Sequence, residues 1–433
     1  MAGEWYLARL SELGEVNRGR SRHRPRDAAH LYGGPYPFIQ TGDIKASNGR
    51  IVSYSQTYSE AGLAQSRLWP TKTMCITIAA NIAETGILTF PACFPDSVIG
   101  FIADECKADV YFVEYAFRMQ KRKLQHEATG SVQDNINLQT LERLEIPVPP
   151  LPEQRAIAHI LGTLDDKIEL NRRMNETLEA IARAIFKSWF VDFNPVRAKA
   201  SGEPPESICR RLGLTPDLLA IFPDRLVDSE LGEIPEGWEV RGLDTIALLS
   251  TASTSPSKQP EVVFEHYSIP AFDSGTMPVY ELGSTIKSNK YVVSPSGVLV
   301  SKLNPETPRV WLPAVKTKTA VCSTEFMQFV PLLGYGRSYL YLMMCSEPMQ
   351  VEILKRVTGS TGSRQRAQPS QIATLPIVVP TENVVRAFES LVTPVLLDKA
   401  GNLDQSQTLA SLRDALLPKL LAGELRVPVA GAA

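Results

Sequence analysis

Alternating arginines near the N-terminus are the first residues whose type and spacing suggest a chemistry. The stretch NRGRSRHRPR, residues 17–26, has arginine at every second position: Arg18, Arg20, Arg22, Arg24 and Arg26. A guanidinium presents planar N–H donors that match a phosphate or the edge of a guanine. Because alternate side chains of an extended chain point to one side, this spacing predicts a basic face that contacts nucleic acid. A solvated loop without a ligand is the alternative.

Two segments that begin with Thr-Gly-Ser form a second candidate. TGSVQDNIN begins at Thr129 and TGSTGSRQR begins at Thr358. Small residues leave backbone N–H groups accessible to a phosphate, while Gln, Asn and Arg side chains can read base edges. The predicted contacts are Thr129, Gly130, Ser131, Gln133, Asn135, Thr358, Gly359, Ser360, Arg364 and Arg366. Arg118 and Arg122 add positive charge, Lys302 and Asn304 are weaker candidates, and ordinary turns would explain the same composition.

Motifs that carry catalysis are missing from the sequence. It has no G-x-x-x-x-G-K-[ST], no G-x-G-x-x-G and no H-E-x-x-H. The prolines after Asn194 and Glu203 do not fit the [Asp/Asn/Ser]-Pro-Pro-aromatic motif of DNA amino-methyltransferases. Asp165 and Asp166 would suit a metal-dependent nuclease, but they lie where a helix is predicted to begin and where carboxylates stabilise the helix dipole. We therefore predict no catalytic residue and no metal site.

Composition limits where such a chain works. The formal net charge is −2 and the pI is near 6.3, so a nucleic-acid surface must be local. The cysteines are scattered without a C-x-x-C pair, which indicates reduced thiols. The N-terminus is charged where a signal peptide is apolar, and no apolar run is long enough to cross a membrane. A cytoplasmic protein is expected.

The elements that must position these residues occur twice. WYLARLSELGEV from Trp5 aligns with WEVRGLDTIALL from Trp238, and the two Thr-Gly-Ser segments align near the end of each copy. Apolar strand-like runs at 73–90 and 297–315 are each followed by a helical pattern, at 110–124 and 338–357. One α+β unit with a tail helix is therefore predicted to be duplicated.

The tail helices are predicted to begin at Thr163 and Thr393, each of which can cap a helix, with Pro394 in the first turn. Each has a narrow apolar stripe, so the two are expected to pack antiparallel as a coiled coil. Their aligned Asn residues would fix the register. The predicted seam residues are Leu164, Ile168, Asn171, Leu178, Ile181, Ile185, Asn402, Leu409, Leu412 and Leu416. The alternative is that each helix lies only on its own domain.

The length of the first helix suggests a spacer. From Thr163 to Phe190 it would extend about 40 Å at ~1.5 Å per residue. This is comparable with one turn of B-DNA, roughly 34–36 Å. Two similar domains held this far apart suit a bipartite DNA site.

Several motifs together resemble one family, the specificity (S) subunits of type I restriction-modification systems. They are the N-terminal Trp, the Thr-Gly-Ser segments, the Pro-rich IPVPPLPEQRAI from Ile146, LDDKIELNRRMNETLEAIARAIFKSWFVDF from Leu164, and FPDRLVDSELGEIPEGWEV from Phe222. The resemblance covers essentially the whole chain. The second copy departs from it, because PTENVV stands where the first copy has PLPEQRAI.

The two α+β parts are predicted at 1–150 and 233–380, and the segment 194–232, which is rich in Pro and charge, is predicted to be a linker. The resemblance implies that the two parts are target-recognition domains, each followed by a conserved spacer-helix region, at 151–193 and 381–433. It implies an approximate two-fold repeat in which each domain reads one half of an asymmetric double-stranded DNA site. The helices would dock two methyltransferase (M) subunits, which restriction (R) subunits join. S-adenosylmethionine, ATP and Mg would belong to those partners, so this chain would carry no cofactor.

Two other functions remain open from the residues. One is a self-contained methyltransferase or nuclease with an unrecognised site, and the other is a coiled-coil scaffold that only joins proteins. Binding of a methyl donor by the purified chain would favour the first. A complex without preference for any DNA sequence would favour the second.

Overall fold

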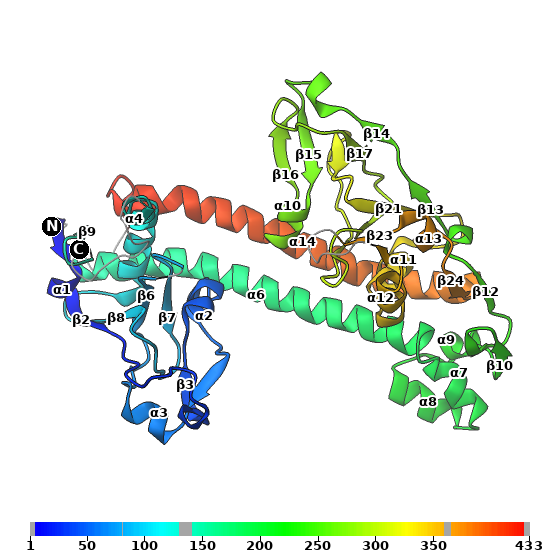
Figure 1. The fold of residues 1–433 in the computed structure, drawn as a ribbon, viewed down its shortest axis with the longest axis horizontal. Coiled ribbons are helices and arrows are strands. Elements are labelled where there is room, and N and C mark those ends of the chain that lie inside the picture. The colour runs from blue at the N-terminus through cyan, green and yellow to red at the C-terminus, as the bar shows by residue number, and fades with distance from the viewer. Residues whose placement is uncertain (1–4, 80, 130–140, 359–364, 428–433) are drawn as a thin grey trace. The chain divides into compact units, whose positions relative to one another are not determined.

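The computed structural model describes residues 5–79, 81–129, 141–358 and 365–427. It divides into two compact units, Met1–Glu169 with Ser406–Ala433 and Leu170–Gln405. Both units contain helices and sheets (Figure 1), which confirms the predicted mixed fold. Two long helices, α6 (Leu151–Phe190) and α14 (Glu382–Leu421), each contribute residues to both units. Among the described residues, no helix combines the length and apolar character that a membrane span requires.

The first unit is built on a five-stranded sheet with the order β2-β8-β6-β7-β4. The strands are β2 (Gly14–Arg18), β4 (Gly49–Ile51), β6 (Met74–Thr77), β7 (Thr85–Leu88) and β8 (Val98–Ala103). Neighbours are antiparallel except β4 and β7, which are parallel. Every residue of β6 and β7 is buried, so these strands occupy the middle of the core. The predicted strand-like run at 73–90 is confirmed.

Helices and short strands complete this unit. They are β1 (Tyr6–Arg9), α1 (Leu10–Leu13), a 3-10 turn (Ala29–Leu31), β3 (Tyr32–Phe38), α2 (Thr41–Ala46), β5 (Gln56–Tyr58), α3 (Glu60–Ala64), α4 (Val110–Thr129) and β9 (Glu145–Val148). α4 contributes Phe112 and Phe117 to the core that also holds Met74 and Phe101. β1 pairs antiparallel with β9, after which the chain enters α6.

The second unit has two main sheets, β13-β21-β18-β19 and β14-β17-β20-β15-β16. The first contains β13 (Ala247–Ser250), β18 (Val298–Ser301), β19 (Val310–Trp311) and β21 (Phe326–Pro331). The second contains β14 (Ser253–Thr254), β15 (Val263–Tyr267), β16 (Val279–Leu282), β17 (Lys290–Val292) and β20 (Ala320–Cys322). The core of this unit joins Val298 and Phe329 of the first sheet to Leu340 and Met344.

The remaining elements of the second unit connect these sheets to α14. They are β12 (Glu239–Gly242), 3-10 turns (Leu243–Thr245 and Pro256–Lys258), α10 (Ile269–Asp273), α11 (Arg337–Cys345), α12 (Glu347–Leu354), β22 (Val357–Thr358), β23 (Arg366–Ala367), α13 (Pro369–Ala373) and β24 (Pro376–Val379). β12 pairs antiparallel with β24, which precedes α14.

The segment 194–232, predicted to be a linker, is folded onto the second unit. It forms α7 (Asn194–Ala200), α8 (Pro205–Leu212), α9 (Pro216–Ala220) and the hairpin of β10 (Leu226–Ser229) and β11 (Gly232–Pro235). Helices this short are not stable alone. Val196, Ile208 and Phe222 are buried in one core with Trp238. The linker prediction is therefore wrong, because burial against distant aromatic side chains stabilises elements that have no long local pattern.

α6 continues through the position where a new helix was predicted to begin. The Thr163 hydroxyl donates to the carbonyl oxygen of His159 at 2.7 Å, within the helix, and does not cap a new one. Ile157 and Leu161, in the turns before it, are fully buried in the core of the first unit. This burial holds the first turns of α6 in line with the rest, so the predicted restart is wrong.

α14 is likewise continuous, although it contains a proline. The Thr393 hydroxyl donates to the Glu389 carboxylate at 2.7 Å, and Pro394 lies inside the helix. A proline in a helix interior costs about 3 kcal/mol. Val392 and Leu396, on either side of it, are buried, and burying each such side chain contributes roughly 1.5–3 kcal/mol. Tertiary burial therefore offsets the cost that made a restart the expected outcome.

Within the second unit, α6 and α14 meet through a layer of amide side chains. Asn171 Nδ2 donates to Gln405 Oε1 at 2.9 Å. Asn402 Nδ2 donates to Asn175 Oδ1 at 3.0 Å. Residue numbers of the partners decrease along α14 as they increase along α6, so the two helices run antiparallel, as predicted. This layer is polar, whereas further along the same two helices Phe186 and Phe190 of α6 pack against Phe388 of α14, with ring centroids 5.9 and 5.0 Å apart.

Candidate nucleic-acid interface

The alternating arginines lie at the end of β2 in the first unit. The extended strand stops at Arg18, and residues 24–27 turn. Alternate side chains therefore do not stay on one side, and that part of the prediction is wrong. The reason is local: Arg24 bends back, and its Nη1 donates to the carbonyl oxygens of Ser21 at 2.7 Å and His23 at 2.8 Å.

One acid, Asp96, gathers several of these arginines. Arg26 Nη2 donates to both Asp96 carboxylate oxygens, at 2.9 and 2.8 Å, and Arg24 Nη2 lies 4.0 Å from Oδ2. Arg18 Nε donates to the Asp96 backbone oxygen. Arg20 and Arg22 are exposed, and within the described residues neither side chain has a hydrogen bond or an ion pair. These two arginines are the uncompensated positive charges of the loop.

In the second unit, predicted residues from separate segments come together. Leu303 forms an antiparallel bridge with Arg366, and the backbone N–H of Asn304 donates to the Gln365 oxygen at 3.1 Å. Asn304 has a φ of 47°, in the left-handed region that Asn tolerates better than most residues. The structure therefore places Lys302, Asn304 and Arg366 on adjacent strand-like segments, as an interface would require.

The charge of Arg366 is balanced by Glu325. Arg366 Nε and Nη2 donate to the two Glu325 carboxylate oxygens, both at 3.0 Å. These hydrogen bonds raise the pKa of the Arg366 guanidinium above its ordinary value. A side chain held in this way loses less conformational entropy when it contacts a ligand. Arg366 is thus pre-oriented, and its local net charge is reduced.

Several other predicted contacts fall outside the described residues. These are Gly130, Ser131, Gln133, Asn135, Gly359, Ser360 and Arg364. The side chains of Arg122, Thr129 and Thr358 are also outside the described set. For all of these residues the DNA contacts stay predictions.

Arg118, predicted to add surface charge, lies in a largely buried network in the first unit. Its Nε donates to Glu114 at 2.5 Å and its Nη1 to Asp165 at 3.3 Å. Burial alone would lower the pKa of Arg118, but Glu114 and Asp165 raise it above the ordinary value. The prediction of a surface role is therefore wrong: Glu114 lies one turn away on α4, and folding of the unit brings Asp165 to Arg118.

The predicted seam residues separate into two groups. Asn171 is fully buried and Asn402 is half-buried. The half-buried apolar members are Leu164, Ile168, Leu178, Ile185, Leu409 and Leu416. Ile181 and Leu412 are 45% and 47% exposed, so their predicted burial between the helices is wrong. Amide and charged side chains make part of the contact between the helices, and the side chains of Ile181 and Leu412 lie outside this contact.

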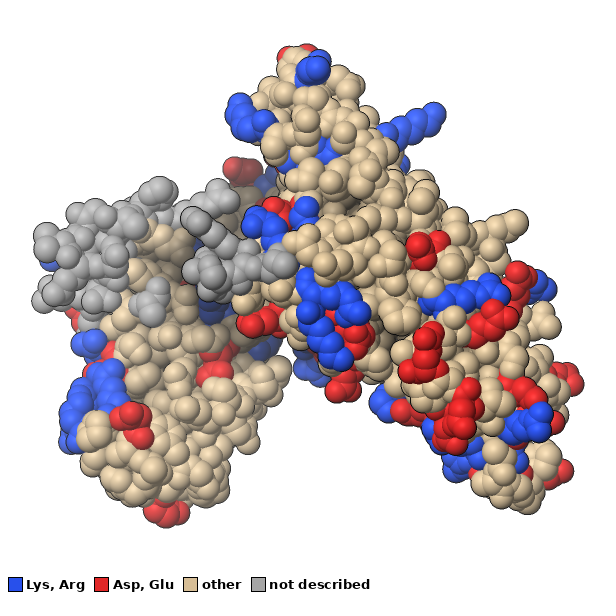
Figure 2. Space-filling model, turned by 45° about the vertical axis from the view of Figure 1, so that its right-hand side comes forward, with Lys and Arg blue, Asp and Glu red and all other residues tan. Residues whose placement is uncertain are grey.

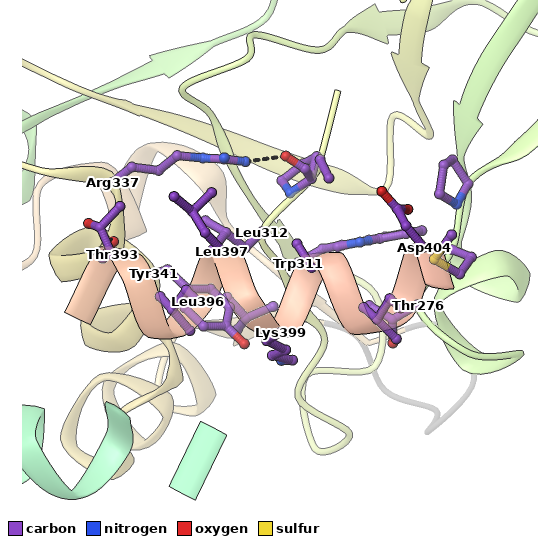
Figure 3. A pocket seen from close by; sticks show the side chains of 18 of the residues that line it. Thr276, Trp311, Leu312, Arg337, Tyr341, Thr393, Leu396, Leu397, Lys399 and Asp404 are labelled. Atoms are coloured by element: carbon purple, nitrogen blue, oxygen red, sulfur yellow. Dashed lines mark hydrogen bonds between the residues drawn. The ribbon is translucent and has the colours of Figure 1, made fainter. Parts of the chain in front are cut away.

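A cavity of about 200 Å³ lies in the second unit, lined by α14, α11 and residues 310–316. Figure 3 shows Arg337 along one side and Trp311 and Leu396 among the apolar side chains. Arg337 donates to the carbonyl oxygens of Gly297 and Pro313, and burial lowers the pKa of Arg337 to about 10. None of the predicted DNA-binding residues lines this cavity. No sequence pattern pointed to it.

Charges of both signs are mixed over the face drawn in Figure 2. At the candidate interface, too, positive and negative charges lie together, because Arg26 pairs with Asp96 and Arg366 pairs with Glu325. Over the ranges that the structure describes, no group of three or more His, Cys, Asp or Glu side chains is placed to hold a metal ion. The arrangement suits binding through a few arginines and amides.

Sequence reasoning missed the two acids that organise these arginines. Asp96 lies in the turn before β8, and Glu325 lies in the turn before β21. β8 is the neighbour of β2 in the first sheet, and β21 is the neighbour of β13 in the second unit. An acid in the turn directly before β8 and before β21 is the signal that would have found them.

Comparison with known proteins finds similarity to specificity subunits of type I restriction enzymes. Residues 3–180 match the family described as the type I restriction modification DNA specificity domain. The chain is 26% identical to the type I restriction enzyme MjaIX specificity subunit of Methanocaldococcus jannaschii, over 98% of this chain and 94% of the relative. It is also 26% identical to the HindI specificity subunit of Haemophilus influenzae, over 75% of this chain and 80% of the relative.

A solved structure shows the same fold. The S subunit of a type I restriction-modification system from M. genitalium superposes with a TM-score of 0.59 at 15% identity, and 96% of each chain is covered. At this identity the likeness concerns the fold alone. Residues 3–180 are therefore similar to the type I restriction modification DNA specificity domain, and the chain as a whole is similar to type I restriction enzyme specificity subunits.

Proposed function

We propose that this chain is the DNA sequence-specificity subunit of a type I restriction-modification complex and recognises a bipartite, asymmetric site in double-stranded DNA. The observation that carries the proposal is the similarity to a named specificity subunit over nearly the full length of both chains. The pre-oriented Arg366 and the exposed Arg20 and Arg22 supply groups suited to base edges and phosphates.

The two halves of the site would be read by two related domains. Corresponding strand orders support this: β2-β8-β6-β7 in the first unit and β13-β21-β18-β19 in the second. In each unit an antiparallel strand pair, β1 with β9 or β12 with β24, precedes a long helix. These correspondences support a duplicated ancestral domain, with one domain for each half-site.

The long helices would serve as spacer and as docking surface. Leu170, Met174 and Ile181 of α6 are 50%, 41% and 45% exposed. Their spacing places them on one face of the helix. We propose that such exposed apolar side chains bind two M subunits, which restriction subunits then join. Catalysis, S-adenosylmethionine, ATP and Mg would reside in those partners, and this chain would be the non-catalytic subunit.

Methylome sequencing of a strain with and without this gene product tests the proposal. A bipartite motif that loses methylation in its absence is the expected result. No change in any motif would contradict the proposal and favour a scaffold. Methyl-donor binding, or modification of DNA, by the purified chain alone would instead favour a self-contained enzyme.

The spacer role has its own test. Inserting one heptad into both α6 and α14 should lengthen the gap between the methylated half-sites. An insertion into α6 alone is the matched control, because it disturbs the antiparallel pairing without a coordinated change. An unchanged gap after the double insertion would contradict the spacer role. It would not contradict the proposal that the chain recognises a DNA sequence.

A further inference from the structure

In the first unit, one carboxylate joins three helices. Asp165, on α6, accepts a hydrogen bond from the Tyr115 hydroxyl of α4 at 2.7 Å. Arg118 Nη1, also from α4, donates to the same oxygen at 3.3 Å. Arg413 Nη1 of α14 donates to the other oxygen at 2.6 Å. The Asp165 side chain is only 10% exposed, so these contacts are largely shielded from water.

The second unit contains a comparable junction around Glu179, also on α6. The Tyr341 hydroxyl of α11 donates to Glu179 Oε1 at 2.9 Å. Lys399 Nζ of α14 donates to Oε2 at 2.7 Å. Arg183 Nε, one turn along α6, donates to Oε1 at 2.8 Å. The Glu179 side chain is 17% exposed.

The two junctions share their chemistry. In each, a tyrosine from a helix of the globular domain and a cation from α14 meet a carboxylate of α6. Burial raises the pKa of Tyr115 and Tyr341 far above the ordinary value, so both hydroxyls stay protonated and donate. Burial opposes ionisation of Glu179, but Lys399 and Arg183 lower its pKa, so the carboxylate is charged.

Such contacts are directional. A hydrogen bond to a charged acceptor is roughly twice as strong as a neutral one and depends on geometry. Losing the carboxylate charge would leave buried cations uncompensated, which costs more than the hydrogen bond itself. Each junction therefore restrains how the globular part of its unit is oriented on the helices.

We infer that Asp165 and Glu179 are positioning residues, each of which sets the orientation of one recognition domain on the helices and so the base discrimination at one half-site. The inference rests on the proposed function. Base contacts require closer alignment than phosphate contacts, so loss of orientation affects the cognate half-site more than unrelated DNA.

The test uses the full chain assembled with the M subunits of its own system. Asp165→Asn is compared with Asp166→Asn, whose side chain is exposed on the same turn, and Glu179→Gln with the exposed Glu176→Gln. Binding is measured to cognate DNA and to DNA altered in one half-site. We expect Asp165→Asn to reduce discrimination at one half-site by about tenfold, the scale of one charge-assisted hydrogen bond. Glu179→Gln should affect the other half-site.

Tyr115→Phe and Tyr341→Phe guard against variants that do not fold. Each removes one hydroxyl and keeps the packed ring, and each should reproduce the half-site effect of its acid partner in weaker form. Equal loss at both half-sites, or a lower yield of complex with unchanged discrimination, would overturn the inference. A wild-type complex with no bipartite preference would overturn the proposed function as well.

Discussion

Arg366 and Glu325 form a two-fold hydrogen-bonded pair in which Nε and Nη2 each lie 3.0 Å from a carboxylate oxygen. The arginine that best fits a base-reading role is thus held by an acid before any ligand arrives. In the first unit Asp96 also holds an arginine, since Arg26 Nη2 donates to both of its carboxylate oxygens. Both pairs reduce non-specific attraction to phosphates while leaving oriented donors, which agrees with the formal net charge of −2.

Removing the charge of Glu325 should show how far this acid limits binding to unrelated DNA. We expect Glu325→Gln to raise affinity for unrelated DNA and to steepen its salt dependence, because Arg366 would face phosphates uncompensated. Binding competition at several salt concentrations measures both effects. Glu306→Gln, an exposed acid without an ion pair among the described residues, is the control. An unchanged salt slope for Glu325→Gln would show that Arg366 does not approach the DNA.

Replacing Arg366 itself should act on one half-site. Arg366→Gln removes the guanidinium, and we expect relaxed discrimination at the half-site read by the second unit only. Methylation of a library of degenerate sites by the assembled complex reports this directly. Equal weakening on every sequence would instead mean that Arg366 contacts phosphate and reads no base.

The amide layer should fix the register of the helices at a cost in stability. Asn402→Ala leaves the side-chain oxygen Oδ1 of Asn175 without this donor. We expect the free energy of unfolding, measured by thermal denaturation, to decrease by about 1–3 kcal/mol. Gln407→Ala, exposed on the same helix, should be neutral. Replacing Asn171, Asn175 and Asn402 together by Leu should restore stability but broaden the accepted gap between half-sites. A single retained gap would argue against a register role.

His266 should make the second unit less stable as the pH falls. Burial lowers the pKa of His266, although its hydrogen bond to Glu281 at 2.6 Å opposes this, and Lys290 lowers it further. Below the ordinary value of 6.5, the unfolded chain therefore takes up a proton that the folded chain does not, so stability decreases with falling pH. His266→Gln should flatten the melting temperature between about pH 7 and pH 5.

The control for this prediction is His159→Gln, which changes an exposed histidine on α6 of the first unit. It should leave the pH dependence as in the wild type. Identical slopes for His266→Gln and the wild type would show that the buried imidazole does not titrate differently in the folded and unfolded chains.

The folded segment 194–232 should depend on Phe222. This ring is 2% exposed and lies edge-to-face with Trp189, with centroids 5.0 Å apart. Phe222→Ala should cost about 3–5 kcal/mol and expose the segment to limited proteolysis before the sheets unfold. Val227→Ala, at a half-exposed position of β10, is the control. If both variants were cleaved as the wild type is, the segment would behave as the linker that its composition predicts.

Local chemistry determined much of this protein. Apolar β-branched runs predicted the central strands at 73–90 and 297–315, because buried strands need such residues whatever their neighbours are. The two long helices and the mixed fold followed from periodicity, and the pairing of the segments around Asn171 and Asn402 followed from their narrow apolar stripes. The resemblance to type I specificity subunits followed from motifs whose order along the chain is itself the signal.

Only the tertiary structure decided where the helices continue and which acids the arginines contact. The helices continue through Thr163 and Pro394 because buried side chains on both sides outweigh local preferences for a break. Arg118 became largely buried against Asp165, Arg26 became paired with Asp96 and Arg366 with Glu325, and each of these acids is distant in sequence. The charge and orientation of a side chain depend on every group that folding brings within a few ångströms, and no spacing along the chain encodes that neighbourhood.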